Sequence, residues 1–138
     1  MNSQKISSKI ASWSLILVGI GHTITYLTSP KTELQNNFIL KMKAFPVDIL
    51  GSKSNLFFFH HGFSLMMGVL LFGYGLLNLF LLKNNKATTT PTNITILNSI
   101  ICLTALLLSI KYFFIVPIVF TGVAFFGYTL SIILKTKK

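Results

Sequence analysis

The chain has 138 residues, of which 52% are hydrophobic and only 10% are charged, and its formal net charge is +10. This composition excludes an ordinary soluble domain, in which about a quarter of the residues are charged. All twelve basic residues are lysines. Without arginine forks or an alternation of aromatic and basic residues, the chain is a poor candidate for binding nucleic acid. Lysines at the ends of apolar stretches instead predict contact with a lipid bilayer, including its anionic headgroups.

Four apolar stretches are each long enough to cross a hydrocarbon core about 30 Å thick. The predicted spans are residues 10–28, 56–82, 94–112 and 114–134. Together they use most of residues 1–138, so we expect a single transmembrane domain. Backbone groups in hydrocarbon must be satisfied within their own segment, which makes each span a helix. The sequence therefore predicts an all-α integral membrane protein, a four-helix bundle in up-down order.

The segment between the first two spans has a pattern of its own. Apolar residues recur near helical spacing opposite lysines and amides: Leu34, Phe38, Ile39, Met42 and Phe45. This pattern predicts a short amphipathic helix over about residues 30–45, beginning at Ser29 and Pro30 and lying in the headgroup plane. It should stop at Phe45, because Pro46 restricts its predecessor and lacks a donor. A segment that only caps the bundle would use the same apolar face, and both interpretations remain open.

The last two spans form one continuous apolar run that is too long for a single crossing. We expect this run to fold back near Lys111 to Pro117 as a tight helical hairpin. Pro117 supports the prediction, because proline is tolerated in the first turn of a helix, where its missing donor is not needed.

The lysines also predict an orientation. With four spans both termini lie on one side, which collects seven lysines, whereas the other side has five lysines and the only two acids, Glu33 and Asp48. The positive-inside rule favours cytoplasmic termini. The lysine-only, Asn-rich composition indicates an AT-rich bacterial genome, so we expect a multi-pass protein of the bacterial inner membrane.

Small and polar residues within each span indicate the face that packs inward. The residues expected to mediate helix packing are Gly19, Ser64, Gly68, Gly75 and Asn78. The inward face of the first span also includes Ser12, His22 and Tyr26. The corresponding faces of the last two spans are Asn98, Cys102, Ala105, Ser109 and Tyr112, and Thr121, Ala124, Tyr128 and Ser131. We interpret Cys102 as a packing residue, since a thiol in hydrocarbon stays protonated.

Three histidines, His22, His60 and His61, are the residues best suited to chemistry. Counting 1.5 Å per residue from the span ends places all three roughly 9 Å below one surface. One hypothesis is that His22 and His61 ligate a b-type haem, or bind a metal or a quinone headgroup, between the first two helices. His60 points about 100° away from His61, so only one of them can share the Gly68 face, and we choose His61. The alternative is that the histidines hydrogen-bond to Tyr26, to Ser64 or to each other and fix the helix register.

Several stretches of the sequence resemble those of other membrane proteins. The run from Asn55 to Asn78, with Phe59 to Gly68 and Tyr74 to Asn78 inside it, together with Gly21 and His22, resembles an uncharacterised family of small bacterial four-span membrane proteins. The resemblance implies a fold and a membrane location and transfers no activity or catalytic residue. In size and number of spans the chain is also similar to DoxX-type four-helix membrane proteins, which are linked to respiratory and quinone functions.

Two functions follow from these observations. The lack of any carboxylate in the spans argues against a carboxylate-based transporter. It favours a non-enzymatic protein, an accessory or structural subunit of an inner-membrane complex or a self-associating homo-oligomer, with no catalytic residue to assign. The alternative is a cofactor-binding membrane protein that uses His22 and His61.

Overall fold

The protein is described by a computed structural model covering residues 3–28, 31–84 and 90–136. Five helices and two strands follow one another in the order α1 (Ser3–Thr28), α2 (Glu33–Ala44), β1 (Pro46–Ile49), β2 (Ser52–Asn55), α3 (Leu56–Asn84), α4 (Thr92–Tyr112) and α5 (Ile115–Thr136). Four of these helices, α1, α3, α4 and α5, are long and apolar enough to cross a membrane. The predicted all-helical class and the number of candidate spans are therefore confirmed.

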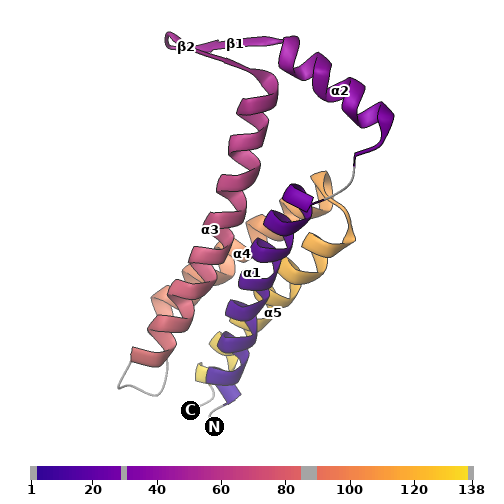
Figure 1. The fold of residues 1–138 in the computed structure, drawn as a ribbon. Helices are drawn as coiled ribbons and strands as arrows, with labels where there is room; N and C mark the ends of the chain where they lie inside the picture. Colours follow the sequence, from indigo (N-terminus) through magenta and orange to yellow (C-terminus); the bar gives the residue numbers. More distant parts are fainter. Residues whose placement is uncertain (1–2, 29–30, 85–89, 137–138) are drawn as a thin grey trace.

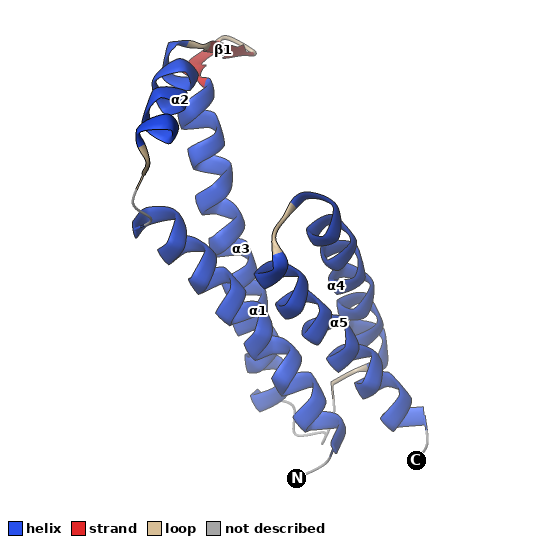
Figure 2. Ribbon diagram, turned by 90° about the vertical axis from the view of Figure 1, so that its right-hand side faces the viewer, coloured by secondary structure: helices blue, strands red, loops and turns tan. Residues whose placement is uncertain are grey.

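The four long helices form two pairs, and α1 is the central helix because it contacts a helix of each pair. α1 packs against both α3 and α5, and α5 packs against α4. The two termini lie at one end of the molecule, whereas α2 and the strands lie at the opposite end, where α3 reaches past the other long helices (Figure 1). A second view shows the α1–α3 pair and the α4–α5 pair diverging toward the α2 end (Figure 2). This divergence positions the site described below.

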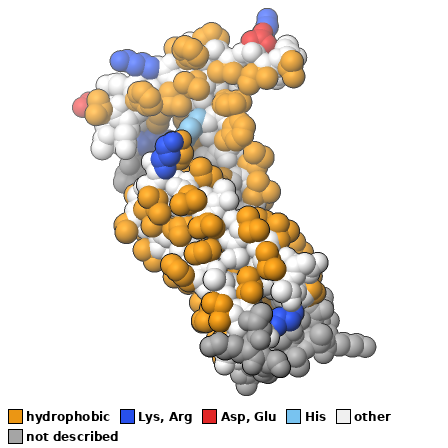
Figure 3. Space-filling view, turned by 180° about the vertical axis from the view of Figure 1, so that it is seen from behind, with side chains coloured by type: hydrophobic (Ala, Val, Ile, Leu, Met, Phe, Trp, Pro, Cys, Tyr) orange, Lys and Arg blue, Asp and Glu red, His pale blue; other side chains and the backbone are white. Residues whose placement is uncertain are grey.

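The surface of the long helices is apolar. Large side chains that are about half exposed or more include Ile24, Val69, Leu107 and Phe126. In the space-filling view hydrophobic side chains cover the middle of the visible face, while charged side chains lie toward its two ends (Figure 3). So much exposed apolar surface is unusual for a soluble monomer, whereas lipid would cover it.

The α1–α3 interface is built from glycines, as predicted. A Cβ atom on Gly19 would lie 2.6 Å from the Phe72 nitrogen and 2.8 Å from the Gly68 oxygen, and one on Gly75 would lie 2.7 Å from the Ser12 oxygen. These neighbours are backbone atoms of the facing helix, so they cannot yield. The two backbones therefore approach closely only because the positions have no side chain. Gly68, Gly75 and Asn78 are buried, while Ser64 is half-buried.

The α1–α5 interface is built from hydroxyls near the start of α1. Ser7 donates to the Gly127 oxygen at 2.6 Å, Ser8 donates to the Ser131 hydroxyl at 2.8 Å, and the Ser12 and Tyr128 hydroxyls lie 3.0 Å apart. These contacts explain why α1 begins at Ser3, well before the predicted start of the span at residue 10. The serines lower the mean hydropathy of this part of the sequence, but their hydroxyl groups find hydrogen-bond partners on α5.

A polar bridge joins α3 to α4. The Tyr74 hydroxyl donates to the Asn98 side-chain oxygen, and the Asn98 amide donates to the Asn78 side-chain oxygen. Most of the predicted inward residues of α4 and α5 are indeed buried: Asn98, Cys102, Ser109, Thr121, Ala124, Tyr128 and Ser131. Ala105 is half-buried, and the prediction for Tyr112 is wrong, because Tyr112 is 65% exposed. It is the last residue of α4, at the turn, where the Lys111 ammonium lies 5.0 Å from its ring centroid.

The α4–α5 turn agrees with the predicted hairpin. α4 ends at Tyr112 and α5 begins at Ile115. Pro117 is therefore in the first turn of α5, where a proline costs no hydrogen bond.

α2 begins and ends with recognisable signals. Thr32 and Gln35 form a reciprocal capping box at its start. The predicted start at Ser29 and Pro30 lies outside the described residues. The helix ends at Ala44 with Phe45 as its C-cap, so the predicted stop before Pro46 is confirmed.

The structure also contains a β-hairpin that the sequence analysis treated as loop. β1 pairs with β2 antiparallel, and the connecting Leu50 and Gly51 have φ values of 52° and 83°. Positive φ at both positions is typical of a type I′ turn, which usually has Asn-Gly or Asp-Gly. Leu50 occupies the position at which asparagine or aspartate is expected. The sequence therefore lacks the usual signal for this turn, and the hairpin was not predicted. The Asp48 carboxylate accepts a bond from the Gly51 nitrogen at 3.1 Å.

Candidate functional site

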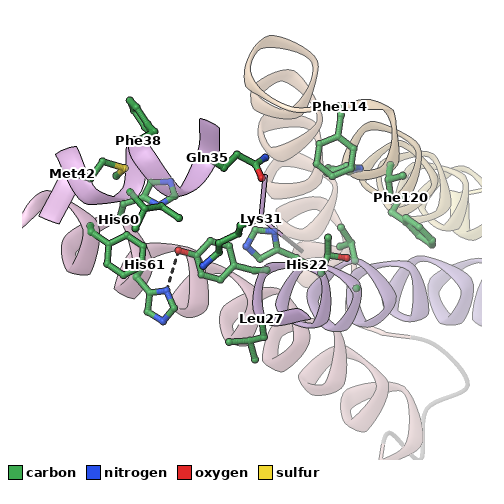
Figure 4. A pocket seen from close by; sticks show the side chains of 18 of the residues that line it. His22, Leu27, Lys31, Gln35, Phe38, Met42, His60, His61, Phe114 and Phe120 are labelled. Atoms are coloured by element: carbon green, nitrogen blue, oxygen red, sulfur yellow. Dashed lines mark hydrogen bonds between the residues drawn. The ribbon is translucent and has the colours of Figure 1, made fainter. Parts of the chain in front are cut away.

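A large cavity lies beneath α2, between the end of α1, the start of α3 and the start of α5. Its volume is about 1190 Å³, which exceeds the roughly 300–1,000 Å³ of common small-molecule sites. Side chains from all four helices surround it (Figure 4). The cavity exists because the two long-helix pairs diverge at this end and α2 crosses over the space between them.

α2 turns its apolar side chains toward this cavity. Leu34, Phe38, Ile39 and Met42 all line it, opposite Phe114 and Phe120. No residue of α2 is fully buried. The apolar stripe seen in the sequence therefore covers a hollow space rather than a packed core.

His22 forms one link between α1 and α3 at the cavity wall. Its Nε2 atom lies 3.1 Å from the backbone oxygen of Ser64 and 3.1 Å from the Ser64 hydroxyl. A carbonyl oxygen can only accept, so the Nε2–H group is the donor. This contact occupies one ring nitrogen of His22.

His61 forms a second link, one turn away. Its Nδ1 atom lies 3.0 Å from the Tyr26 hydroxyl, and the Tyr26 and His61 ring centroids are 5.1 Å apart. Tyr26 also stacks on His22 with centroids 6.2 Å apart. The choice of His61 as the histidine facing α1 agrees with this geometry. The prediction that all three histidines lie at the same depth does not agree with it. The antiparallel register pairs His22 with Ser64 and Tyr26 with His61, so His22 and His61 lie about one helical turn apart.

The arrangement of His22 and His61 does not fit a haem held by both. Bis-histidine ligation requires two imidazole nitrogens to face each other across the macrocycle. Here the Tyr26 ring contacts both imidazole rings, and one nitrogen of each is engaged: His22 Nε2 with Ser64 and His61 Nδ1 with Tyr26 itself. Within the described ranges no group of three or more His, Cys, Asp or Glu side chains is placed to hold a metal ion. Both hydrogen bonds named in the structural alternative, to Tyr26 and to Ser64, are present.

His60 differs from the other two histidines because its side chain is exposed and lines the cavity. Its ring lies 6.3 Å from the Tyr26 ring, measured between centroids. In the close-up it lies on the α2 side of the cavity, near Met42 and Phe38 (Figure 4). Its ring nitrogens are therefore available to a ligand.

Two lysines converge on the cavity wall near the histidines. The Lys31 ammonium lies 6.0 Å from the Phe57 ring centroid and the Lys43 ammonium lies 5.2 Å from it. Lys31 and Phe57 line the cavity directly. The lining residues include a lysine and three histidines and no carboxylate. This end of the cavity is thus a cationic mouth, formed by Lys31, Lys43, Phe57 and His60.

A second space adjoins the first along the outside of α3. It has a volume of about 680 Å³ and runs past Met66, Met67, Leu70 and Leu71 to Tyr74, with Ile101 of α4 opposite. His22 and His60 belong to the walls of both spaces. In the described part of the chain α3 and α4 lack the close packing that joins α1 to α3, α1 to α5 and α4 to α5, which leaves this lateral groove between them.

The histidines were predicted from the sequence, but four further residues complete the site. They are Lys31, Gln35, Phe57 and Phe120, and the sequence does not mark them as functional. The one usable signal was the apolar face of the 30–45 segment, which needed something to cover. No protein-family model, curated protein or solved structure matches the chain.

Proposed function

We propose that this chain is a non-enzymatic multi-pass membrane protein that takes up an amphipathic, lipid-soluble molecule in the cavity beneath α2. The observation that carries the proposal is the cavity itself, about 1190 Å³, apolar over most of its wall and polar at one corner. Such a combination is typical of ligand sites, where apolar surface gives affinity and a few polar groups orient the ligand. A quinone headgroup is one member of this class, since its carbonyl oxygens could accept bonds from His60.

The lateral groove supports the same proposal. A ligand dissolved in the bilayer would approach from the side rather than from water, and the groove between α3 and α4 adjoins the cavity at His22 and His60. Methionines on its wall adapt to different chain shapes. The proposal includes an up-down bundle in a bacterial inner membrane, α2 at the external headgroup level, and cytoplasmic termini.

The prediction of an accessory or structural subunit, or of a homo-oligomer, stays a prediction. The exposed apolar side chains of α4 and α5 could contact a partner helix, but lipid would cover the same side chains. The ligand proposal is preferred because a cavity with its own polar corner has no role in simple helix packing.

The proposal is tested by filling the cavity. Gly21 lines it, and a Cβ atom there would meet nothing within 4 Å. Gly21→Phe therefore projects a ring into the cavity without a backbone collision. Gly73→Phe is the matched control, because Gly73 is also an exposed helical glycine with open space around it and lines neither space.

The probe is an uncharged alkyl glycerol whose chain carries a diazirine, reconstituted with the purified protein in vesicles. Peptide mass spectrometry should find labelling concentrated on residues such as Met42, Met66 and Phe120. Gly21→Phe should lose most of that labelling and Gly73→Phe should keep it. Labelling spread evenly over lipid-facing side chains, and insensitive to Gly21→Phe, would overturn the proposal.

A further inference from the structure

We infer that the molecule bound beneath α2 is an anionic amphiphile drawn from the bilayer, with its headgroup between Lys31, Lys43 and His60 and its chain in the groove along α3. This inference rests on the proposed function and specifies its ligand class. Three observations carry it: the charge of the mouth, the lack of an internal counter-ion, and the position of the second space next to the first, at His22 and His60.

The cationic mouth brings charges together without neutralising them. Both lysine ammonium groups lie within about 6 Å of the Phe57 ring. Cation–π contact with a phenylalanine is weak at an exposed site and leaves the full charge of each ammonium group in place. An anion at this position would meet two cations and an aromatic wall.

No carboxylate of the described residues lines the cavity at that position. The only acids are Glu33 and Asp48, and neither lines the cavity. Asp48 instead accepts a bond from Gly51 in the hairpin turn. In the described residues Lys31 and Lys43 have no ion pair, although Glu33 and the two lysines lie on neighbouring segments. The counter-charge that the mouth lacks is the one a ligand would supply.

Polar donors beside the lysines extend the headgroup site. Gln35 and His60 line the cavity near Lys31 (Figure 4). Gln35 also uses its side-chain oxygen to cap α2, at 2.9 Å from the Thr32 nitrogen, which turns its amide nitrogen toward other acceptors. Charged acceptors such as phosphate or sulfonate oxygens form the stronger bonds with such donors.

The groove next to the cavity offers an apolar site for the chain of the ligand. From the mouth, the walls shared at His22 and His60 adjoin the groove of Met66, Leu70 and Ile101. This groove descends along α3 toward the middle of the long helices, so a chain placed there would run parallel to the surrounding lipid. A water-soluble anion would use the mouth but not the groove.

The experiment compares two photoreactive probes that share one diazirine-bearing alkyl chain, an alkyl sulfonate and the uncharged alkyl glycerol. The sulfonate is ionised at every working pH. We expect it to label cavity and groove residues about 25-fold more than the glycerol, since each of the two lysines beside an anionic group contributes roughly fivefold. In Lys31→Gln/Lys43→Gln the preference for the sulfonate should be lost, so that the two probes label to the same extent.

Lys53→Gln is the matched control, because Lys53 is an exposed lysine of β2 at the same end of the molecule and lines neither space. It should keep the preference for the sulfonate. Equal labelling of the native protein by both probes would overturn the inference and leave the proposed function standing. A sulfonate preference that survives Lys31→Gln/Lys43→Gln, or that Lys53→Gln abolishes, would mean that the general positive charge of the surface attracts the probe. That outcome would also overturn the inference. Failure of both probes to label the cavity would remove the proposed function as well.

Discussion

His22 on α1 and Ser64 on α3 are joined at 3.1 Å through the imidazole Nε2 atom and the serine backbone oxygen. Four residues further along α1, Tyr26 meets His61 at 3.0 Å. The two contacts lie one helical turn apart on both helices, so together they fix the antiparallel register of α1 and α3. All three histidines line the cavity, but this register makes His22 and His61 links between the helices, whereas His60 takes part in neither link.

The histidines should therefore separate into two classes. His61→Ala removes the bond to Tyr26 and the stacking on Phe57, whose centroid lies 5.6 Å away. We expect a loss of about 1 kcal/mol in unfolding free energy, typical of interhelical bonds in membranes. His60→Ala should change the unfolding free energy little and should lower labelling of the cavity by the alkyl sulfonate probe. Unfolding in mixed micelles with increasing denaturing detergent measures the first effect, and equal destabilisation by both variants would contradict the assignment.

Gly19 should be among the least replaceable residues of α1. A Cβ atom there collides with backbone atoms of Gly68 and Phe72, so Gly19→Ala must push α1 and α3 apart. Overpacking of this kind costs about 1–3 kcal/mol. Gly73→Ala is the control, because its Cβ would enter open space, and should be neutral or slightly stabilising. The same unfolding assay compares them. Equal effects would show that the helices do not approach closely at Gly19.

The bridge from Tyr74 to Asn98 should couple α3 to α4. A double-mutant cycle with Tyr74→Phe and Asn98→Ala should give an interaction energy of about 0.6 kcal/mol, and at most about 1.7 kcal/mol. Pairing Tyr74→Phe with Thr104→Val should give a value near zero, since the exposed Thr104 hydroxyl bonds only to Ile100 of its own helix. A coupling no larger than this control would mean that the bridge does not hold the helices together.

The proposed orientation can be checked with two single cysteines. Ser3 and Ser52 are both exposed and lie at opposite ends of the molecule (Figure 1). In right-side-out vesicles a membrane-impermeant maleimide should label Ser52→Cys, and should label Ser3→Cys only after permeabilisation. The native chain is the control, because Cys102 is 1% exposed and should not react. Labelling of Ser3→Cys in sealed vesicles would reverse the orientation.

Much of the fold could be read from the sequence because it depends on local composition. Hydrophobic length determined the four candidate spans, Pro117 indicated the turn before α5, and Pro46 ended α2. Glycine and serine spacing identified the inward faces, since a helix places residues three and four apart on one side. The α1–α5 contacts of Ser7, Ser8 and Gly127 were missed, because serine near a chain end looks the same whether solvent or a helix satisfies it.

Only the tertiary structure decided the site. The register between His22 and Ser64, the divergence of the two helix pairs and the path of α2 over the gap depend on non-local packing. Residues far apart in the chain, Lys31, Phe57 and Phe120, then line one cavity. The sequence by itself determined that the protein has four long apolar helices, a cationic surplus and an amphipathic connecting segment. Where that segment lies, and what space it covers, was determined by the packing of α1 against α5 near the termini and by the divergence of the two helix pairs at the other end (Figure 2).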